Sequence, residues 1–261
     1  MVTGAGSGIG RATALAFAKE GARIAACDVD QVRLDALAKE LGDRCLLART
    51  VDVADRARMK AFADAVHAVV PAADVIVNNA GVGLGGNFVD TSLDDWDWIL
   101  GINLKGVVHG CHFFIPKMIE RGAGGHVINL SSILGIYPAP SISAYVATKF
   151  AVRGMSLALR GELAPHKIGV TAICPGLIAT QIMADGRLAG DIAERKGKIV
   201  DTFKRGAPPS KVADAILDAV HTNPAVRTVG ADAYLLAALT RVAPRVMAKL
   251  GSTVQRRFAA S

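Results

Sequence analysis

The sequence predicts an α/β protein with a doubly wound parallel sheet. Short apolar segments alternate with amphipathic helical patterns along the chain, which is typical of βαβ units. A glycine-rich turn over residues 3–10 enters the first helical pattern. The length of 261 residues suits one large domain with a substantial core. We therefore expect a Rossmann-like single domain over residues 1–230 and an extra helical tail over residues 231–261.

Composition limits the class of protein. The chain is 51% hydrophobic and 20% charged, so a globular protein is expected. Its apolar runs are far shorter than the roughly 18 residues of a membrane span, and no secretory signal pattern opens the sequence. The four cysteines are isolated, which favours reduced thiols. These features together predict a cytoplasmic protein.

Neither a metal site nor a nucleic-acid interface is expected. His109 and His112 share a helix face, but no carboxylate or thiolate partner is identifiable, so a structural role is favoured over metal binding. The net charge of +7 is diffuse, and the few aromatic residues do not interleave with basic ones. A groove for nucleic acid normally combines the two.

The first βαβ unit carries a candidate dinucleotide site. Its glycines let the backbone approach a pyrophosphate, toward which the free N–H groups at the helix start point. Asp28 ends the strand predicted over residues 23–27, where an acid accepts hydrogen bonds from the adenosine ribose. A 2′-phosphate would meet like charge there. This favours NAD over NADP, although Arg11 and Arg33 leave NADP open.

The first strand is expected to be incomplete. Only Met1 and Val2 precede the glycine loop, whereas such a loop normally follows a buried strand. Three explanations of the short strand remain open: a start placed too far downstream, a fragment of a longer chain, or a naturally shortened strand. Restoring about five apolar residues upstream is expected to raise the thermal stability.

The following elements continue the alternation. A helix capped by Asp30 ends at Gly42 and leads to a strand over residues 45–51, after which Asp52 and Val53 are placed to hold the adenine. A further helix precedes a buried strand over residues 74–77. Ser92 and Asp95 resemble a capping box. The long helix that they open contains Asn103.

Residues 131–149 hold the groups with catalytic chemistry. Ser131 and Ser132 follow a strand over residues 126–130, and Tyr145 and Lys149 are four residues apart in a helical pattern, so they share one face. A tyrosine with a pKa of about 10 is a poor base near neutrality. A cation about 4 Å away would favour phenolate by about 4 kcal/mol at an effective dielectric of about 20. Lys149 is therefore expected to lower the pKa of Tyr145. Such a pair alone could, however, simply lie on the surface of a helix without a catalytic role.

The last third of the chain ends the sheet. A strand over residues 169–174 runs into residues 175–180, and residues 181–208 lack strong periodicity, as expected for a mobile flap. A helix over 211–221 and a strand over 225–229 follow. The tail continues as an apolar and basic helix over 231–250, interrupted at Pro244.

Together these motifs closely resemble the short-chain dehydrogenase/reductase family. In order, they are Thr3-Gly4-xxx-Gly8-x-Gly10, Asn78-Asn79-Ala80-Gly81, Asn103, Ser132, Tyr145-xxx-Lys149 and Pro175-Gly176-xxx-Thr180. The resemblance covers residues 2 to about 230. It implies hydride exchange between NAD(H) and a secondary alcohol or ketone.

The resemblance also implies residue roles. Tyr145 would be the general acid/base, Lys149 would lower its pKa and bind the nicotinamide ribose, and Ser132, rather than Ser131, would hold the substrate oxygen. Asn103 would hold a water that links Lys149 to solvent. The implied cofactor-binding set is Thr3, Gly4, Ser7, Gly8, Ile9, Gly10, Asp28, Asp52, Val53, Asn79, Ala80, Gly81, Tyr145, Lys149, Pro175, Gly176, Ile178 and Thr180, with Thr180 and the Ile178 backbone on the carboxamide.

The substrate, the assembly and the tail are less constrained. The expected pocket walls are mostly apolar and suggest a hydrophobic alcohol or ketone; they are Val82, Leu84, Ile133, Leu134, Ile136, Tyr137, Leu177, Ile182 and Met183. A non-catalytic dinucleotide sensor or scaffold on the same fold is the alternative, although it would not need the four catalytic residues together. We expect a homodimer through the helices of Asn103 and Tyr145. The tail is expected to pack over the core or the active-site mouth, with contact to a membrane surface as the less favoured alternative.

Overall fold

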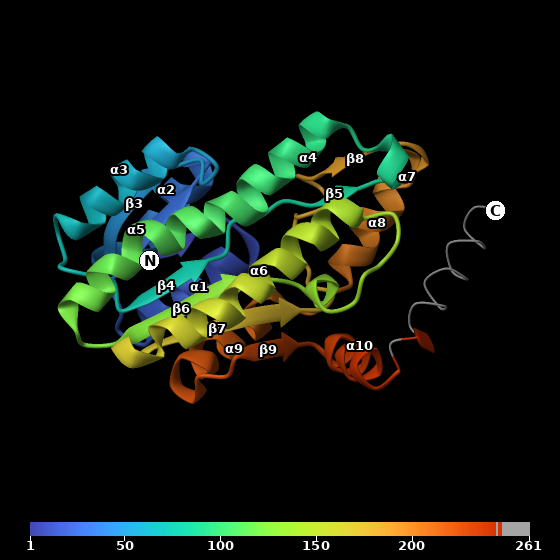
Figure 1. Cartoon of the computed structure of the whole chain (residues 1–261). Helices are drawn as coiled ribbons and strands as arrows, with labels where there is room; N and C mark the ends of the chain where they lie inside the picture. The colour runs from blue at the N-terminus through green and yellow to red at the C-terminus, as the bar shows by residue number, and fades with distance from the viewer. Residues whose placement is uncertain (244, 247–261) are drawn as a thin grey trace.

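The computed structural model describes residues 1–243 and 245–246. In this part of the chain, a seven-stranded parallel sheet has the order β3-β2-β1-β4-β6-β7-β9, with helices on both faces (Figure 1). The strands are β1 (Val2–Thr3), β2 (Ile24–Asp28), β3 (Cys45–Thr50), β4 (Val75–Asn78), β6 (Gly125–Leu130), β7 (Ile168–Pro175) and β9 (Val226–Val229). The predicted single-domain, doubly wound fold is confirmed. Its strand order reverses between β1 and β4, where such sheets bind ligands.

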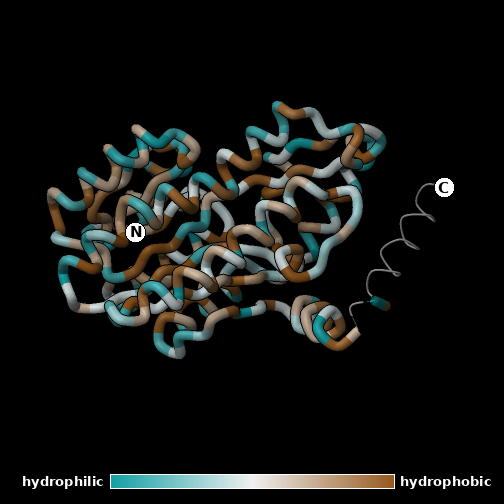
Figure 2. Tube along the Cα trace, viewed as in Figure 1, coloured by the Kyte–Doolittle hydropathy of each residue, from teal (hydrophilic) through white to brown (hydrophobic). Residues whose placement is uncertain are grey.

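Two apolar layers hold the helices against the sheet. One layer lies under α3 (Arg56–His67), α5 (Gly106–Arg121) and α6 (Ser143–Leu163), and the other under α1 (Gly8–Lys19), α2 (Gln31–Leu41) and α9 (Pro209–Thr222). In the first layer, the ring centroids of Phe62 and Phe114 are 6.1 Å apart. Figure 2 shows hydrophobic residues concentrated along the central strands. Burial of these faces is the main force that fixes the elements in place.

The predicted helix starts are confirmed at two caps. The Asp30 side chain accepts the Arg33 N–H at 3.0 Å at the start of α2. The Ser92 hydroxyl accepts the Asp95 N–H at 3.1 Å and donates to its carboxylate, opening α4 (Leu93–Leu100). A π-helical segment, η3 (Gly101–Lys105), joins α4 to α5 and contains Asn103. Such segments often mark functional sites.

The run from Leu93 to Arg121 is long and apolar enough to cross a membrane by length and composition. Half of its most apolar window is buried inside the fold. Its residues Val107, Phe114 and Met118 pack in the core under the sheet. This packing accounts for the high hydropathy of the run, which is typical of a helix buried in the core of a protein.

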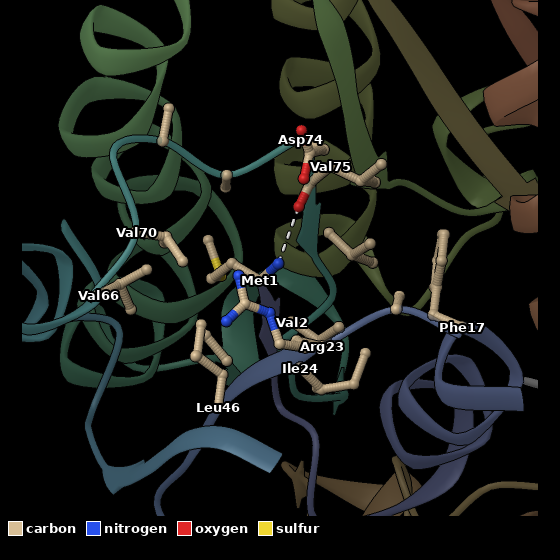
Figure 3. A pocket seen from close by; sticks show the side chains of 15 residues that line it. Met1, Val2, Phe17, Arg23, Ile24, Leu46, Val66, Val70, Asp74 and Val75 are labelled. Atoms are coloured by element: carbon tan, nitrogen blue, oxygen red, sulfur yellow. Dashed lines mark hydrogen bonds between the residues drawn. The ribbon is translucent and has the colours of Figure 1, made fainter. Parts of the chain in front are cut away.

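Strand β1 is short, as predicted, and an apolar slot lies beside its start. Val2 pairs with Ala26 of β2 and with Val77 of β4, and the Met1 nitrogen donates to the Val75 carbonyl at 2.8 Å. A cavity of about 160 Å³ adjoins this point (Figure 3). The side chains that line it are mostly apolar and include Phe17, Leu46, Val66 and Val70.

The predicted flap is built of short elements. Residues 181–208 contain β8 (Arg187–Leu188), α7 (Asp191–Glu194) and α8 (Lys196–Lys204), and β8 pairs in parallel with β5 (Leu84–Gly85). The chain also has short turns of 3₁₀ helix at η1 (Gly42–Arg44), η2 (Phe88–Asp90), η4 (Ile133–Gly135) and η5 (Ala164–His166).

The tail begins as α10 (Ala231–Val242), which contacts β9 and η4. Ala233 is fully buried there, whereas Tyr234, Leu235, Leu239 and Val242 are exposed. The first turn of α10 therefore packs near the cavity, whereas the rest of this helix presents apolar side chains to solvent; the packing of the whole tail stays a prediction. Pro244 and the predicted continuation to Leu250 lie outside the described residues.

Candidate active site

A cavity of about 740 Å³ follows the carboxyl ends of the central strands. Most of the predicted site residues line it: Gly4, Ser7, Gly8, Ile9, Asp28, Asp52, Val53, Asn79, Ala80, Gly81, Ser132, Tyr145, Lys149, Pro175, Gly176, Ile178 and Thr180. Thr3, Gly10 and Asn103 do not line it. The parallel topology brings these segments together because every strand ends at the same edge of the sheet.

The glycine loop has backbone that other residues would strain. Gly4 and Gly8 have φ angles of +62° and +52°, in the left-handed region that favours glycine. A Cβ on Gly10 would lie 2.1 Å from the Gly4 carbonyl oxygen. Gly10 thus allows α1 to start tight against the loop, which directs the free N–H groups of the helix start into the cavity.

Thr3 and Asn79 fasten the glycine loop to the end of β4. The Thr3 hydroxyl accepts the N–H groups of Asn79 and Ala80, each at 3.0 Å. The Asn79 amide donates to the carbonyls of Thr3 and Gly4 at 2.9 and 3.0 Å. Thr3 is only 2% exposed. It therefore lies behind the cavity wall, where its hydrogen bonds hold the glycine loop against the end of β4.

Asp28 lies where the ribose acid was predicted. Its carboxylate accepts the N–H of Gly6 at 2.7 Å and that of Asp30 at 3.0 Å. Arg33, one of the residues that kept NADP open, forms ion pairs with Asp30 and with Asp185, each at 3.1 Å. Asp185 belongs to the flap, so this pair joins α2 to the flap at the cavity. No local pattern predicts this ion pair, because the two residues are 152 positions apart in the sequence.

The predicted adenine segment is also held in place. Asp52 accepts the Ala54 N–H at 2.9 Å, and the Val53 carbonyl lies 2.8 Å from Nδ1 of the buried His109. A Cβ on Gly106 would lie 2.6 Å from the Val53 side chain. The predicted structural role of His109 is therefore confirmed, and that role is to fix one wall of the cavity.

Ser132, Tyr145 and Lys149 line the same cavity. The Ser132 hydroxyl accepts the Leu134 N–H at 3.1 Å and is hydrogen-bonded to the Tyr145 phenol. Ser131 also borders the cavity, but its hydroxyl is engaged in a hydrogen bond that it donates to the Lys149 carbonyl at 2.8 Å. The geometry thus agrees with the preference for Ser132 over Ser131. The Lys149 ammonium donates to the Leu130 carbonyl at 2.9 Å and lies 5.5 Å from the centre of the Tyr145 ring.

Burial governs the ionisation of both groups. It raises the pKa of Tyr145 to about 12, against the opposing hydrogen bond from Ser132, and it lowers the pKa of Lys149 to about 8. The predicted lowering of the Tyr145 pKa is therefore wrong for the protein chain alone. The reason is that desolvation disfavours both charged forms, while the ammonium is directed to a backbone carbonyl. In the protein chain alone, the neutral phenol of Tyr145 is therefore favoured over the phenolate.

Asn103 lies close to Lys149 and is fully buried. Its amide pairs with the backbone of Val82, accepting the N–H at 2.8 Å and donating to the carbonyl at 2.9 Å. A Cβ on Gly81 would lie 3.2 Å from the Asn103 oxygen and 3.5 Å from the Lys149 nitrogen. The backbone of Gly81 therefore passes between the two side chains. The role of Asn103 in holding a water stays a prediction.

The loop after β7 is held by three separate segments. Its Gly176 N–H donates to the Val229 carbonyl at 2.8 Å, and Ala207 exchanges hydrogen bonds at 2.9 Å with the Leu177 carbonyl and the Ala179 N–H. The Asp232 carboxylate accepts the Leu177 N–H at 2.8 Å. Sequence reasoning missed Asp232, since α10 follows the last matched motif.

The substrate end of the cavity is mostly apolar. Six of the expected wall residues line it, namely Val82, Ile133, Leu134, Leu177, Ile182 and Met183, and Trp98, Ile102, Ile142 and Phe203 join them. Leu84, Ile136 and Tyr137 do not. Arg187 of the flap is engaged outside, pairing with Asp95 at 2.8 Å and lying 4.1 Å from the Trp98 ring centre. Trp98 was missed because its helical position alone does not distinguish a cavity wall from a core contact.

Potential metal ligands are not clustered in the part of the chain that the structure describes: no group of three or more His, Cys, Asp or Glu side chains there could hold a metal ion. Its four cysteines are free thiols. The cavity presents a hydroxyl, a phenol, an ammonium, carboxylates and backbone groups, an arrangement suited to binding a dinucleotide and moving a proton.

Known proteins share these features. A family model described as short chain dehydrogenase matches residues 1–189. A probable oxidoreductase of Mycobacterium tuberculosis, EphD, is 43% identical over 255 residues, covering 94% of this chain and 43% of its own length. The chain thus spans less than half of that relative. The putative oxidoreductase SadH of the same organism is 36% identical and covers 100% of this chain and 93% of its own. A short chain dehydrogenase/reductase from Burkholderia phymatum, solved in complex with NAD, superposes with a TM-score of 0.86 at 26% identity, covering 94% of this chain and 93% of its own.

Proposed function

Because the chain belongs to the short-chain dehydrogenase/reductase family of oxidoreductases, we propose that it exchanges hydride between NAD(H) and a hydrophobic secondary alcohol or ketone. The observation that carries this proposal is the convergence of Ser132, Tyr145 and Lys149 on one wall of the cavity. That cavity also reaches the glycine loop and Asp28. A proton donor and a dinucleotide cleft therefore open into one space.

The chain supplies binding and proton transfer. When bound, the nicotinamide ring accepts or donates the hydride, and its oxidised form adds a positive charge. The Ser132 hydroxyl and the Tyr145 phenol hold the substrate oxygen. Tyr145 gives its proton to that oxygen during ketone reduction and removes it during alcohol oxidation. In the second direction, the Lys149 ammonium, 5.5 Å from the Tyr145 ring centre, would act together with the positive charge of the bound oxidised ring to offset the burial that raises the pKa of Tyr145.

The proposed preference for NAD rests on charge. Asp28 places a carboxylate where a 2′-phosphate would lie, and like charges repel. Arg33 is already paired with two carboxylates, those of Asp30 and Asp185, so it is less available to a phosphate. The ratio of kcat/KM for the two cofactors tests this assignment, and a preference for NADP would overturn it.

The proposed substrate class rests on the cavity walls. The side chains near Tyr145 are mostly apolar, and Trp98 and Ile142 extend the apolar surface identified from the sequence. The nearest charged flap residues, Asp185 and Arg187, are held in ion pairs. A substrate with a large apolar body would displace water from these walls and gain affinity.

Absorbance at 340 nm with NAD and a panel of secondary alcohols tests the proposed reaction. The panel should include large apolar alcohols beside small ones, because the walls predict a preference for the former. Turnover that rises with apolar size supports the proposal. Cofactor binding without turnover on any alcohol or ketone would favour the alternative of a dinucleotide sensor.

We also propose that the protein works in a reducing compartment such as the cytoplasm, and that it forms a homodimer. The helices that carry Tyr145 and Cys111 expose apolar side chains at Val108 and Leu157, and pairing of this face between two copies would cover them. Mass measurement in solution tests the assembly. A monomer at micromolar concentration would exclude it.

A further inference from the structure

Asp232 lies in the first turn of α10 and reaches back to the loop of residues 175–180. Its carboxylate accepts the Leu177 N–H at 2.8 Å. A Cβ on Gly176 would lie 2.2 Å from one carboxylate oxygen, and a Cβ on Gly230 would lie 2.5 Å from the other. Gly230 also has a φ of +109°, which favours glycine. Both glycines are therefore required for the carboxylate to occupy this place.

The contact joins the tail to both halves of the candidate site. On one side, Asp232 holds the segment whose next residue, Ile178, is the proposed partner of the nicotinamide carboxamide. On the other side, α10 contacts η4, which directly follows Ser132. The first turn of α10 is thus placed where it can set the distance between the cofactor loop and the substrate loop.

The charge of Asp232 faces the cavity. The residue lines it together with Tyr145, Lys149 and Gly176. In the part of the chain that the structure describes, no lysine or arginine forms an ion pair with this carboxylate. Asp232 is an exposed residue at the rim of the cavity, where its carboxylate favours a nearby positive charge over a neutral group, though less strongly than in the protein interior.

We propose that Asp232 is a positioning residue for the nicotinamide end of the cofactor and that its charge favours the oxidised, cationic ring over the reduced, neutral one. The inference rests on the proposed use of NAD(H). Its hydrogen bond to Leu177 orients the loop, while its charge discriminates between the two redox forms. A single charge at the rim of a partly solvated cleft is expected to change a binding constant about three- to tenfold.

Binding titrations with NAD⁺, NADH and ADP-ribose separate these roles. Asp232→Asn keeps an oxygen for the Leu177 N–H and removes the charge, so the affinity for NAD⁺ should fall about three- to tenfold while that for NADH stays within twofold. Asp232→Ala also removes the hydrogen bond and should weaken both nicotinamide forms. ADP-ribose, which lacks the nicotinamide, should bind every variant equally and reports that the fold is intact.

The matched control is Asp214→Asn. Asp214 lies exposed on α9 and does not line the cavity, so the same loss of charge there should leave all three affinities unchanged. An unchanged ratio of NAD⁺ to NADH affinity in Asp232→Asn would overturn the inference about Asp232 alone. Failure of the unaltered protein to bind any of the three ligands would contradict the proposed function itself, and the inference with it.

Discussion

The two ends of the central strands carry cavities that differ in size and in the groups that border them. At the carboxyl end, about 740 Å³ is lined by loop backbone and by charged side chains such as Asp28, Arg33 and Lys149. At the amino end, the slot of about 160 Å³ beside Met1 is lined mainly by apolar side chains, with Arg23 and Asp74 as its charged members. The same strands border both.

The difference shows how a parallel sheet divides its functions. Loops that leave the carboxyl ends have free backbone groups and varied side chains, so they can bind a ligand. The slot at the amino end is an interruption in the apolar layer that continues under α3. Changes at the carboxyl end should therefore alter catalysis or cofactor choice, whereas changes at the amino end should alter stability alone.

The largest expected effect is that of Tyr145→Phe. Removing the phenol removes the group proposed to transfer a proton to and from the substrate oxygen, so kcat should fall by about 10³-fold or more. NAD binding should stay within about twofold, because the ring remains. Steady-state kinetics and a binding titration measure the two quantities. Tyr137→Phe is the control, since Tyr137 does not line the cavity; retained activity in Tyr145→Phe would refute the role.

Lys149→Met should abolish turnover and yet stabilise the fold. Burial lowers the pKa of Lys149 from 10.5 to about 8, which corresponds to a cost of about 3 kcal/mol for keeping it charged at neutral pH. Below pH 8 both the folded and the unfolded states hold the proton, so this cost is full. Between pH 8 and 10.5 the folded state loses the Lys149 proton before the unfolded state does. The cost of the buried charge therefore decreases through this range and is gone above it.

Denaturation at pH 7 and at pH 10 checks this prediction. The methionine variant should be more stable than the unaltered protein at pH 7, and the difference should shrink at pH 10. A variant that is less stable at both values would show that the Lys149 hydrogen bond to Leu130 outweighs the desolvation of the ammonium.

Asp28→Asn should change cofactor choice. It removes the charge that opposes a 2′-phosphate and weakens the acceptor for the ribose, so the ratio of kcat/KM for NAD to that for NADP should fall about ten- to a hundredfold. Asp35→Asn on α2, the helix that follows Asp28 and β2, is the control, because Asp35 lies outside the cavity. Equal ratios in both variants would remove Asp28 from the cofactor site.

Filling the amino-end slot should have the smallest effect on catalysis and a measurable one on stability. An extension of about five apolar residues before Met1 would continue β1 between β2 and β4, and should raise the melting temperature by about 5 °C. An equally long Gly/Ser extension should not. The value of kcat/KM should stay unchanged, and a change there would contradict the separation of the two ends.

The sequence by itself determined the order of the elements and the chemistry of the site. Alternating apolar patterns, the caps at Asp30 and Ser92 and the glycine loop are local signals, because they depend on backbone geometry over a few residues. For this reason the doubly wound sheet and the cavity lining around Tyr145 could be predicted before the structure was known.

Only the tertiary structure decided how these groups behave together. Burial raises the pKa of Tyr145 against the expectation from its spacing to Lys149, Thr3 acts behind the cavity, and Arg33 pairs with Asp185 across 152 positions. Asp232 reaches Leu177 from a helix beyond the last motif. Desolvation and contacts between distant segments depend on packing in three dimensions, which a local sequence pattern does not contain.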